Sequence, residues 1–393
     1  MTTSSRRGFL RLALGASAAA SLPPFHILAQ TKGPRGPDQP VRIGYLPITD
    51  ATPLLVAHAN RFYEAEGLVS QAPTLFRSWA QIAEAFVAGQ VNVVHVLSPL
   101  AIWLRYGKLF PAKVVAWNHT NGSALTVLPE IRSVQDLAGK TVAIPLWYSI
   151  HNVVIQKLIA DAGLKLDTGA EGKTAPDAVR LVVLPPSDMI SALANKSIAG
   201  YIVAEPFNAV AEGLGIGRIL RFTGDVWRDH ACCVVLMREE DVVQNWEWSQ
   251  RVVNAVVRAQ QWIEPHREET ARILCRDNAN LYTPHPLSAL ERVFADRDID
   301  RYVQSGAIRH PSWHEPRIGF QPYPFGSYTE ELVRALRQTH VEGDNAFLAS
   351  LDPAFAAGDL VDDSLVKTAM GLMGGAAAFG IDPSFSRREE IGV

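Results

Sequence analysis

The stretch VRIGYLPITDATPLLVAHANRFYEAEG, from Val41 to Gly67, predicts a short strand followed by a helix. Val41–Leu46 is a short apolar run of the kind that forms a β-strand. Thr52 suits the start of a helix, and Pro53 suits its first turn, where the N–H that proline lacks would have no partner. Gly67 favours the end of the helix. Strand, loop and helix in this order are the unit from which α/β folds are built.

The same alternation continues along the chain. Helical patterns that begin near Ser, Thr or Pro separate further short apolar runs, and these runs predict strands at residues 73–76, 91–97, 113–117, 124–128, 141–145, 181–184, 200–204 and 231–237. Beyond Asn245 the pattern is mostly helical, apart from a proline-rich insertion at 311–324, which we expect to line a lobe surface or cover the mouth of a cleft. The sequence therefore predicts an α/β fold with a helical C-terminal part.

The predicted strands form two groups, which divide near residues 121–123 and rejoin near residues 231–237. We expect lobe I to comprise residues 41–123 and 235–393, and lobe II to comprise residues 124–234, with two crossovers between them. Strand ends and helix N-termini would face the cleft between two such lobes, so this cleft is the expected ligand site.

The N-terminus carries a predicted export signal. Residues 5–11, SRRGFLR, resemble the twin-arginine export motif, and the apolar run behind them, Leu12–Leu22, is too short to span a bilayer. Cleavage after Ala20 or Ala29 would fit, and loss of residues 1–29 removes three arginines and no acid, which changes the net charge from −3 to −6. Residues 30–40 are rich in proline and glycine and predict a linker.

Composition excludes several classes of protein. The net charge of −3 lacks the excess of basic residues that binding to nucleic acid would need. Three cysteines are too few for a disulfide framework, and their order in the chain has no zinc-site spacing, so the sequence predicts neither a metal site nor a cofactor.

Five segments resemble the nitrate/sulfonate/taurine (NitT/TauT) family of ABC-transporter substrate-binding proteins: residues 42–54 (RIGYLPITDATPL), 62–68 (FYEAEGL), 133–143 (SVQDLAGKTVA), 201–207 (YIVAEPF) and 225–230 (DVWRDH). The resemblance implies a two-lobed periplasmic-binding-protein fold of type II that closes on a ligand at a hinge. It also implies a monomeric, non-enzymatic receptor in the periplasm, which passes a small molecule to an ABC permease in the cytoplasmic membrane. A receptor that has lost transport and serves as a sensor partner is an alternative.

The densest polar and aromatic cluster lies between a predicted strand and a predicted helix, at Trp147, Tyr148, Ser149 and His151. Two rings offer stacking surfaces, and Ser149 and His151 can hydrogen-bond a ligand, although Ser149 also suits the N-cap of the helix. The family also uses this turn for ligand contact. The alternative is that one ring only covers the interface between the lobes.

Two further candidates follow strands in lobe I. Trp79 stands where related nitrate binders place a pocket tryptophan, and its alternative role is that of a core aromatic residue. Ser98 begins a helix after a strand, where it could meet an anion or simply cap the helix.

Glu205 and His230 complete the predicted ligand-binding set. A buried carboxylate at Glu205 would repel an anion, so it could instead hold the hinge or bind a cationic group. His230 matches a histidine of the nitrate and bicarbonate binders, but Cys233 stands where those proteins carry a lysine or a calcium-linked acid. This difference disfavours nitrate and bicarbonate. The aromatic cluster at Trp147 and Tyr148 fits a larger, partly apolar or planar ligand better, so we expect an organosulfonate-like or heteroaromatic compound.

Cys232 and Cys233 are adjacent, and strand alternation would point their side chains to opposite faces. They could be two small buried residues. The alternative is an enzyme related to the thiamine-pyrimidine synthases, with His151, Cys232 and Cys233 in its chemistry.

Overall fold

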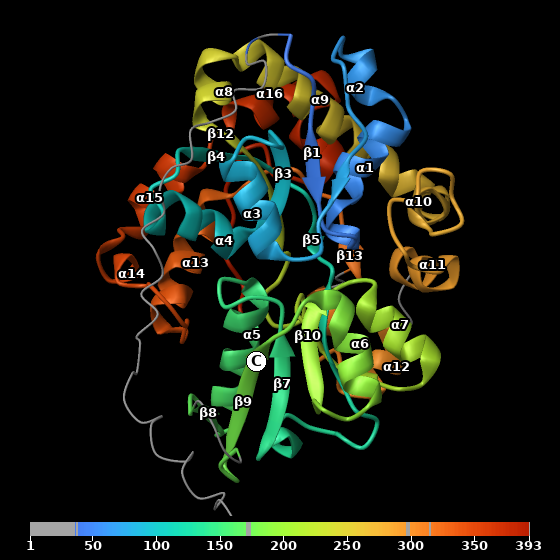
Figure 1. Ribbon diagram of the computed structural model, residues 1–393, viewed down its shortest axis with the longest axis vertical. Coiled ribbons are helices and arrows are strands. Elements are labelled where there is room, and N and C mark those ends of the chain that lie inside the picture. Colours follow the sequence, from blue (N-terminus) through green and yellow to red (C-terminus); the bar gives the residue numbers. More distant parts are fainter. Residues whose placement is uncertain (1–35, 37, 170–173, 296–298, 314–315, 393) are drawn as a thin grey trace, which may run out of the picture. The chain divides into compact units, whose positions relative to one another are not determined.

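The computed structural model describes residues 36, 38–169, 174–295, 299–313 and 316–392. The predicted signal peptide, residues 1–29, and most of the predicted linker, residues 30–40, lie outside this part of the chain. The described residues form a mixed α/β fold, as the sequence predicts, and Figure 1 shows its elements.

The first sheet has five strands in the order β2-β1-β3-β12-β4. Its strands β1, β2 and β3 are parallel, and β12 runs antiparallel to its neighbours β3 and β4. The C-terminal ends of β1 to β4 and the N-terminal end of β12 therefore lie at one edge of the sheet. The bounds are β1 (Ile43–Tyr45), β2 (Thr74–Leu75), β3 (Val93–Leu97), β4 (Ala112–Trp117) and β12 (Cys233–Arg238).

The second sheet has six strands in the order β11-β6-β10-β7-β9-β8, all from residues 123–222. Strand β6 is antiparallel to β10 and β11, whereas β10, β7, β9 and β8 are parallel. The bounds are β6 (Ser123–Val127), β7 (Lys140–Ile144), β8 (Lys165–Asp167), β9 (Ala178–Val183), β10 (Gly200–Ala204) and β11 (Arg218–Phe222).

Two crossovers join the sheets, at residues 118–122 and 223–232, and they run side by side. The Asn121 N–H donates to the His230 carbonyl over 2.9 Å, and the Asn118 N–H donates to the Cys233 carbonyl over 3.2 Å. Such paired connections are a natural hinge between two lobes.

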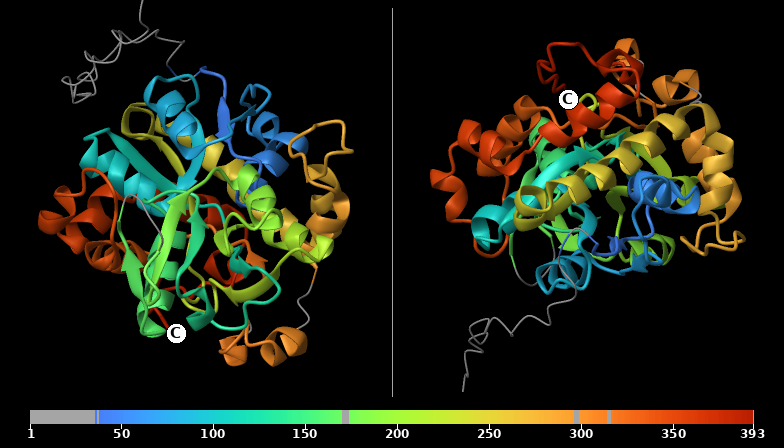
Figure 2. Two further views of the ribbon diagram at one scale, coloured as in Figure 1. Left: turned by 60° about the horizontal axis from the view of Figure 1, so that its bottom comes forward. Right: turned by 90° about the horizontal axis from the view of Figure 1, so that it is seen from above.

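Helices cover both sheets, and the long helix α9 packs beside α1 and α16 over the first sheet (Figures 1 and 2). The helices are α1 (Thr52–Ala59), α2 (Phe62–Ala65), α3 (Trp79–Val87), α4 (Ser98–Ile102), α5 (Ile150–Asp161), α6 (Pro186–Ala194), α7 (Phe207–Leu214), α8 (Glu239–Gln244), α9 (Trp246–Ile263), α10 (Arg267–Leu274), α11 (Leu287–Phe294), α12 (Ile299–Gln304), α13 (Gly326–Gln338), α14 (Phe347–Ser350), α15 (Pro353–Leu360) and α16 (Ser364–Leu372).

The proline-rich insertion differs from its prediction. Instead of covering a cleft mouth, it contributes the two-residue strand β13 (Ile318–Gly319), which pairs antiparallel with β5 (Thr120–Asn121) in the first crossover. Ile318 is fully buried there. Just before this strand, Arg317 donates from Nε to Glu205 Oε1 over 2.7 Å. The insertion therefore adds a third chain segment to the hinge, because its apolar residue and its arginine both find buried partners.

Helix α12 also lies beside the second sheet, where the ring of Tyr302 meets that of Phe222 edge-on at 4.8 Å. The division into lobe I and lobe II at the predicted boundaries stays a prediction.

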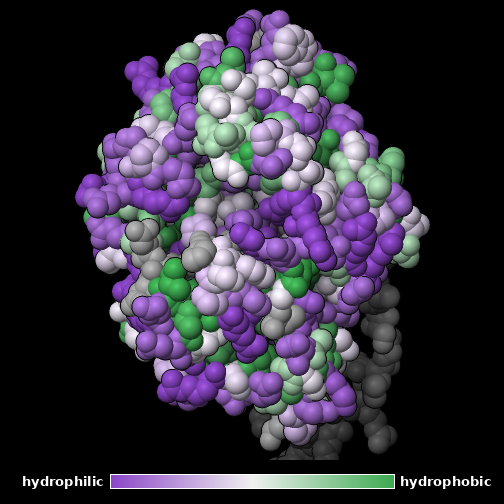
Figure 3. Space-filling view, turned by 180° about the vertical axis from the view of Figure 1, so that it is seen from behind, coloured by the Kyte–Doolittle hydropathy of each residue, from purple (hydrophilic) through white to green (hydrophobic). Residues whose placement is uncertain are grey.

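On the face shown in Figure 3, hydrophobic side chains form small separate patches on a mostly hydrophilic surface. In the described part of the chain, each helix is too short or too polar to cross a bilayer.

Candidate functional site

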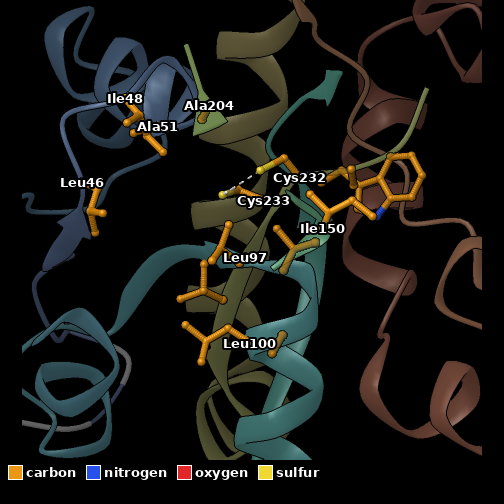
Figure 4. Packing of buried hydrophobic residues seen from close by; sticks show 14 of the residues in the cluster. Leu46, Ile48, Ala51, Leu97, Leu100, Ile150, Ala204, Cys232 and Cys233 are labelled. Atoms are coloured by element: carbon orange, nitrogen blue, oxygen red, sulfur yellow. Dashed lines mark hydrogen bonds between the residues drawn. The ribbon is translucent and has the colours of Figure 1, made fainter. Parts of the chain in front are cut away.

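Eight buried side chains meet where the crossovers adjoin the edge of the first sheet, and we call them the buried polar cluster. Each is at most 2% exposed, and around the two cysteines lie apolar residues that include Ile48, Ala51, Leu97, Ile150 and Ala204 (Figure 4). The cluster consists of Asp50, Trp79, His95, His119, His151, His230, Cys232 and Cys233.

Strand direction explains this assembly. Asp50 follows β1, and His119 follows β4, so both residues leave the same edge of the sheet. Cys233 begins β12, and because β12 is antiparallel to β3, Cys233 pairs with Leu97 at the end of that strand. His151 lies on the side of the second sheet, in the first turn of α5. Residues from both lobes therefore contribute to one buried site.

Asp50 and His119 form a fully buried ion pair, with 3.0 Å between Asp50 Oδ2 and His119 Nε2. Burial alone would lower the pKa of His119, but the Asp50 carboxylate raises it to about 10. Burial likewise opposes ionisation of Asp50, and His119 nevertheless holds the pKa of that carboxyl below its usual range. Among the described residues neither Asp50 oxygen has a hydrogen bond of good geometry.

Trp79 and His95 present two hydrogen-bond donors. His95 Nε2 accepts from the Leu46 N–H over 2.9 Å, and burial lowers the pKa of His95 to about 3, so the ring is neutral and its proton must sit on Nδ1. His95 Nδ1 and Trp79 Nε1 both lack a partner in the described chain. The two rings lie 5.5 Å apart, edge to face.

His230 presents an acceptor instead. The Thr223 hydroxyl donates its only proton to the Ser123 carbonyl over 3.0 Å. Its oxygen must therefore accept the hydrogen bond from His230 Nε2, 2.8 Å away. Burial lowers the pKa of His230 to about 3, which leaves the neutral ring with a bare lone pair on Nδ1. That nitrogen has no partner among the residues described.

The structure corrects the prediction that Cys232 and Cys233 point to opposite faces. Their sulfurs lie 4.0 Å apart as free thiols instead of pointing to opposite faces, because Cys232 precedes β12 and is not bound by strand alternation (Figure 4). Burial opposes ionisation of both thiols, but the hydrogen bond between them lowers the pKa of Cys232 and raises that of Cys233. Cys232 Sγ also lies 3.8 Å from His151 Nε2, which is 2.9 Å from Ser123 Oγ.

Unpaired polar atoms in a dry interior cost free energy, on the order of 1–3 kcal/mol each. The cluster concentrates several of them, and they include donors on Trp79 and His95 and an acceptor on His230. A bound ligand with complementary groups would remove this cost, so the cluster is the candidate ligand site.

The predicted aromatic contacts Trp147 and Tyr148 lie elsewhere. Trp147 is half-buried, with its ring 5.5 Å from that of His340. Tyr148 stacks on Phe347 at 6.2 Å and donates from its hydroxyl to the Asp344 carbonyl over 2.9 Å. Both rings therefore pack against the segment around α13 and α14, a contact far along the chain that local sequence does not reveal.

Three other predicted residues have partners within the protein. Ser149 caps α5 by accepting from the Asn152 N–H over 3.0 Å, and it donates to the Leu146 carbonyl. Ser98 Oγ donates to the carbonyls of Ala231 and Cys232, and so supports the loop that carries the thiols. Glu205 is paired with Arg317, as the hinge alternative proposed.

Of the predicted site residues, the structure brings Trp79, His151 and His230 into the cluster, and a ligand role for any of them stays a prediction. Asp50, His95 and His119 were missed. Asp50 and His119 each follow a strand of the first sheet, and this position at the strand ends is a signal that could have found them. His95 lies inside β3, where a histidine is easily taken for a packing residue.

Comparisons with known proteins agree with this architecture. Residues 35–276 match the NMT1-like family. The nitrate/nitrite binding protein NrtA of Nostoc sp. is 26% identical over 375 residues, which cover 84% of this chain and 82% of that protein. The crystal structure of the periplasmic nitrate-binding protein NrtA from Synechocystis has a TM-score of 0.69 at 19% identity, covering 87% of this chain and 91% of that one.

The alkanesulfonate-binding protein SsuA from Xanthomonas axonopodis pv. citri has a TM-score of 0.58 at 16% identity, covering 82% of this chain and 98% of that one. At these identities the structural likeness concerns the fold, and it confirms the predicted two-lobed fold of periplasmic binding proteins.

Proposed function

Because this chain belongs to the NMT1-like family, we propose that it is the solute-binding receptor of an ABC importer. In this proposal the twin-arginine signal directs the chain to the periplasm, where its lobes close on a small molecule and present it to a permease. The relatives support this role, since NrtA binds nitrate or nitrite and SsuA binds alkanesulfonates.

The set of unpaired buried atoms carries the proposal. A receptor that closes on its ligand needs polar groups that the protein itself does not satisfy, and within the described part of the chain Trp79, His95 and His230 present such groups. A purely structural core would have paired them, because most buried polar groups in proteins are hydrogen-bonded.

The same atoms bear on the ligand class. Nitrate and simple alkyl- or arylsulfonates offer acceptors alone at neutral pH, and they would meet the bare lone pair of His230 and the nearby Asp50 carboxylate. A ligand with both donors and acceptors suits the cluster better. We therefore favour a small heteroaromatic compound with an N–H group over an organosulfonate or nitrate, and the preference no longer rests on Trp147 and Tyr148. Bicarbonate also carries a donor, and it is disfavoured because Cys233 stands where the bicarbonate binders have a calcium-linked acid.

A thermal-unfolding screen of the mature protein tests this function. The compounds are nitrate, bicarbonate with calcium, taurine, alkyl- and arylsulfonates, and pyrimidines that carry N–H donors. A ligand at 100 times its dissociation constant stabilises the folded state by about 2.7 kcal/mol, which raises the melting temperature by several degrees. A shift with a pyrimidine alone supports the proposal. A shift with nitrate or a sulfonate alone would contradict the ligand class.

One observation favours a second candidate, an enzyme. Cys232 Sγ lies 3.8 Å from a ring nitrogen of His151, and its pKa is lowered against the effect of burial by the bond from Cys233 and by neighbouring imidazoles. Mass spectrometry of the bound compound after release separates the two functions. A receptor returns its ligand unchanged, whereas an enzyme returns a compound of altered mass.

A further inference from the structure

We propose that Asp50, His119, Cys232 and Cys233 bind a thiophilic divalent metal ion such as Zn²⁺. We call these four residues the hinge cluster. Each offers one ligand atom, these atoms all lie within 4.8 Å of one another, and all four residues are fully buried.

The spacing suits a tetrahedral ion. With metal–sulfur bonds of about 2.3 Å, two thiolates of a tetrahedral site lie about 3.8 Å apart, and the nitrogen and oxygen ligands lie about 3.3 Å apart. In the hinge cluster the sulfurs are 4.0 Å apart, and Asp50 Oδ2 is 3.0 Å from His119 Nε2. These two distances are within about 0.3 Å of the tetrahedral values, and the other separations, which are at most 4.8 Å, would have to shorten on binding.

The donor set decides the class of ion. Two thiols, one imidazole and one carboxylate suit Zn²⁺ and similar ions, whereas Mg²⁺ and Ca²⁺ prefer oxygen ligands alone. Asp50 supplies a second observation. Beyond its ion pair with His119, its two buried oxygens lack well-formed hydrogen bonds in the described chain, so carboxylate lone pairs remain that a metal ion could use.

The position of the cluster suggests what the ion would do. His119 lies on the first crossover, Cys232 ends the second crossover, Cys233 begins β12, and Asp50 follows β1. The ion would join the two crossovers to lobe I and so fix the hinge. On binding, two thiol protons and the proton shared by His119 and Asp50 pass to solvent, so no oxidant or reductant is needed.

The metal site and the proposed solute contacts share the buried polar cluster but use different atoms. The ion would be held by Asp50, His119, Cys232 and Cys233, whereas the solute would contact Trp79, His95 and His230, so each kind of binding can be measured without the other. Failure of the metal test therefore leaves the receptor function standing, and failure of the ligand screen leaves the metal site standing.

Titration with Co²⁺ tests the proposal on the mature, reduced protein after treatment with a chelator. We expect one equivalent to bind and to give the thiolate-to-cobalt charge-transfer absorption and the visible bands of a tetrahedral site, and one equivalent of Zn²⁺ should abolish them. Cys232→Ser and Cys233→Ser should each lower the affinity at least tenfold. Cys275→Ser is the matched control, because it removes the third buried thiol, which bonds to the Arg272 carbonyl.

Circular dichroism checks that each variant is folded. If a serine variant does not fold, His119→Gln and the stoichiometry of the unmodified protein decide the question. Absence of thiolate-to-cobalt absorption in the unmodified protein would overturn the proposal, and so would full absorption in a folded Cys232→Ser/Cys233→Ser variant.

Discussion

Arg317 shows how this protein handles buried charge away from the candidate site. Its guanidinium is almost fully buried and contacts two carboxylates, Glu205 at 2.6 Å and Glu212 at 3.2 Å. The arrangement joins the proline-rich insertion to the residue that follows β10. A pair of this kind adds little net stability when intact, but loss of one partner leaves an uncompensated charge in a dry environment.

Arg317→Met should therefore lower the free energy of unfolding by about 3–5 kcal/mol. Arg334→Met is the matched control, because Arg334 is about half exposed and its pair with Glu330 should contribute less than about 1 kcal/mol. Urea unfolding followed by circular dichroism measures both. Equal losses in the two variants would contradict the role given to Arg317.

His285 gives a pH prediction. It is 5% exposed, it donates from Nε2 to the Pro47 carbonyl over 2.8 Å, and burial lowers its pKa to about 4. Below about pH 6.5 the imidazole of His285 is protonated in the unfolded chain but stays neutral in the folded protein. The free energy of unfolding therefore falls as the pH drops from 6.5 towards 4.

His285→Gln keeps a donor for Pro47 but does not titrate. Between pH 7 and pH 4 the unmodified protein should lose about 3 kcal/mol more stability than this variant, as measured by urea unfolding at each pH. Identical pH profiles would show that His285 does not contribute.

At the level of elements, the start of α5 places His151 in the cluster. Ser149 binds the Asn152 N–H at the helix N-terminus and the Leu146 carbonyl in the preceding loop, so it fixes the entry of the chain into the helix. Ser78 caps α3 in the same way by accepting from the Gln81 N–H, and Trp79 follows it directly. Two site residues thus owe their positions to serine caps.

Ser149→Ala should lower the free energy of unfolding by about 1 kcal/mol and leave ligand affinity within twofold, because the hydroxyl bonds to the backbone. Ser149→Thr should restore most of the loss, since its hydroxyl can make both bonds. Urea unfolding and calorimetric titration measure the two quantities. A tenfold loss of affinity in a stable Ser149→Ala variant would instead assign Ser149 to ligand contact.

Local patterns predict most of these elements. The runs around β1, β3, β4 and β10 are apolar and buried, and their predicted bounds agree with the structure to within about two residues. Strand β11 has arginine at two of its five positions, so no apolar run marks it, and β5 and β13 are only two residues long. Between β6 and β7 the chain forms only a single helical turn, at Gln135–Leu137.

At the level of the whole molecule, the two lobes meet around the cluster through a few direct contacts. The Thr49 N–H in lobe I donates to the Glu205 carbonyl beyond β10 over 3.0 Å, and Phe207 meets His285 edge-on. Closure of two lobes about a hinge is how such a fold can signal that a ligand is bound. The cluster lies beside these contacts, so a ligand there would hold both lobes.

The α/β fold follows from local patterns and the family from the resemblance of five segments, but only part of the candidate site could be predicted. Trp79 and His230 were selected because they match positions of related binders, and His151 because it lies in a polar and aromatic turn between a strand and a helix. The convergence of Asp50, His119, Cys232 and Cys233 could not, because they come from three separate segments and have no metal-site spacing. The packing of Trp147 and Tyr148 outside the buried polar cluster could not be predicted, because their partners lie about 200 residues further along the chain, and a ligand role for them stays a prediction.

The most direct test compares the buried polar cluster with the turn that carries Trp147. It uses calorimetric titration with the compound found in the screen. Trp79→Phe removes the unpaired indole N–H but keeps an aromatic ring against His95, and Trp147→Phe makes the same change outside the cluster. We predict that Trp79→Phe lowers the affinity about tenfold, as the loss of one buried hydrogen bond would, and that Trp147→Phe leaves it within twofold. A tenfold loss in Trp147→Phe with unchanged affinity in Trp79→Phe would place the ligand elsewhere and contradict the account.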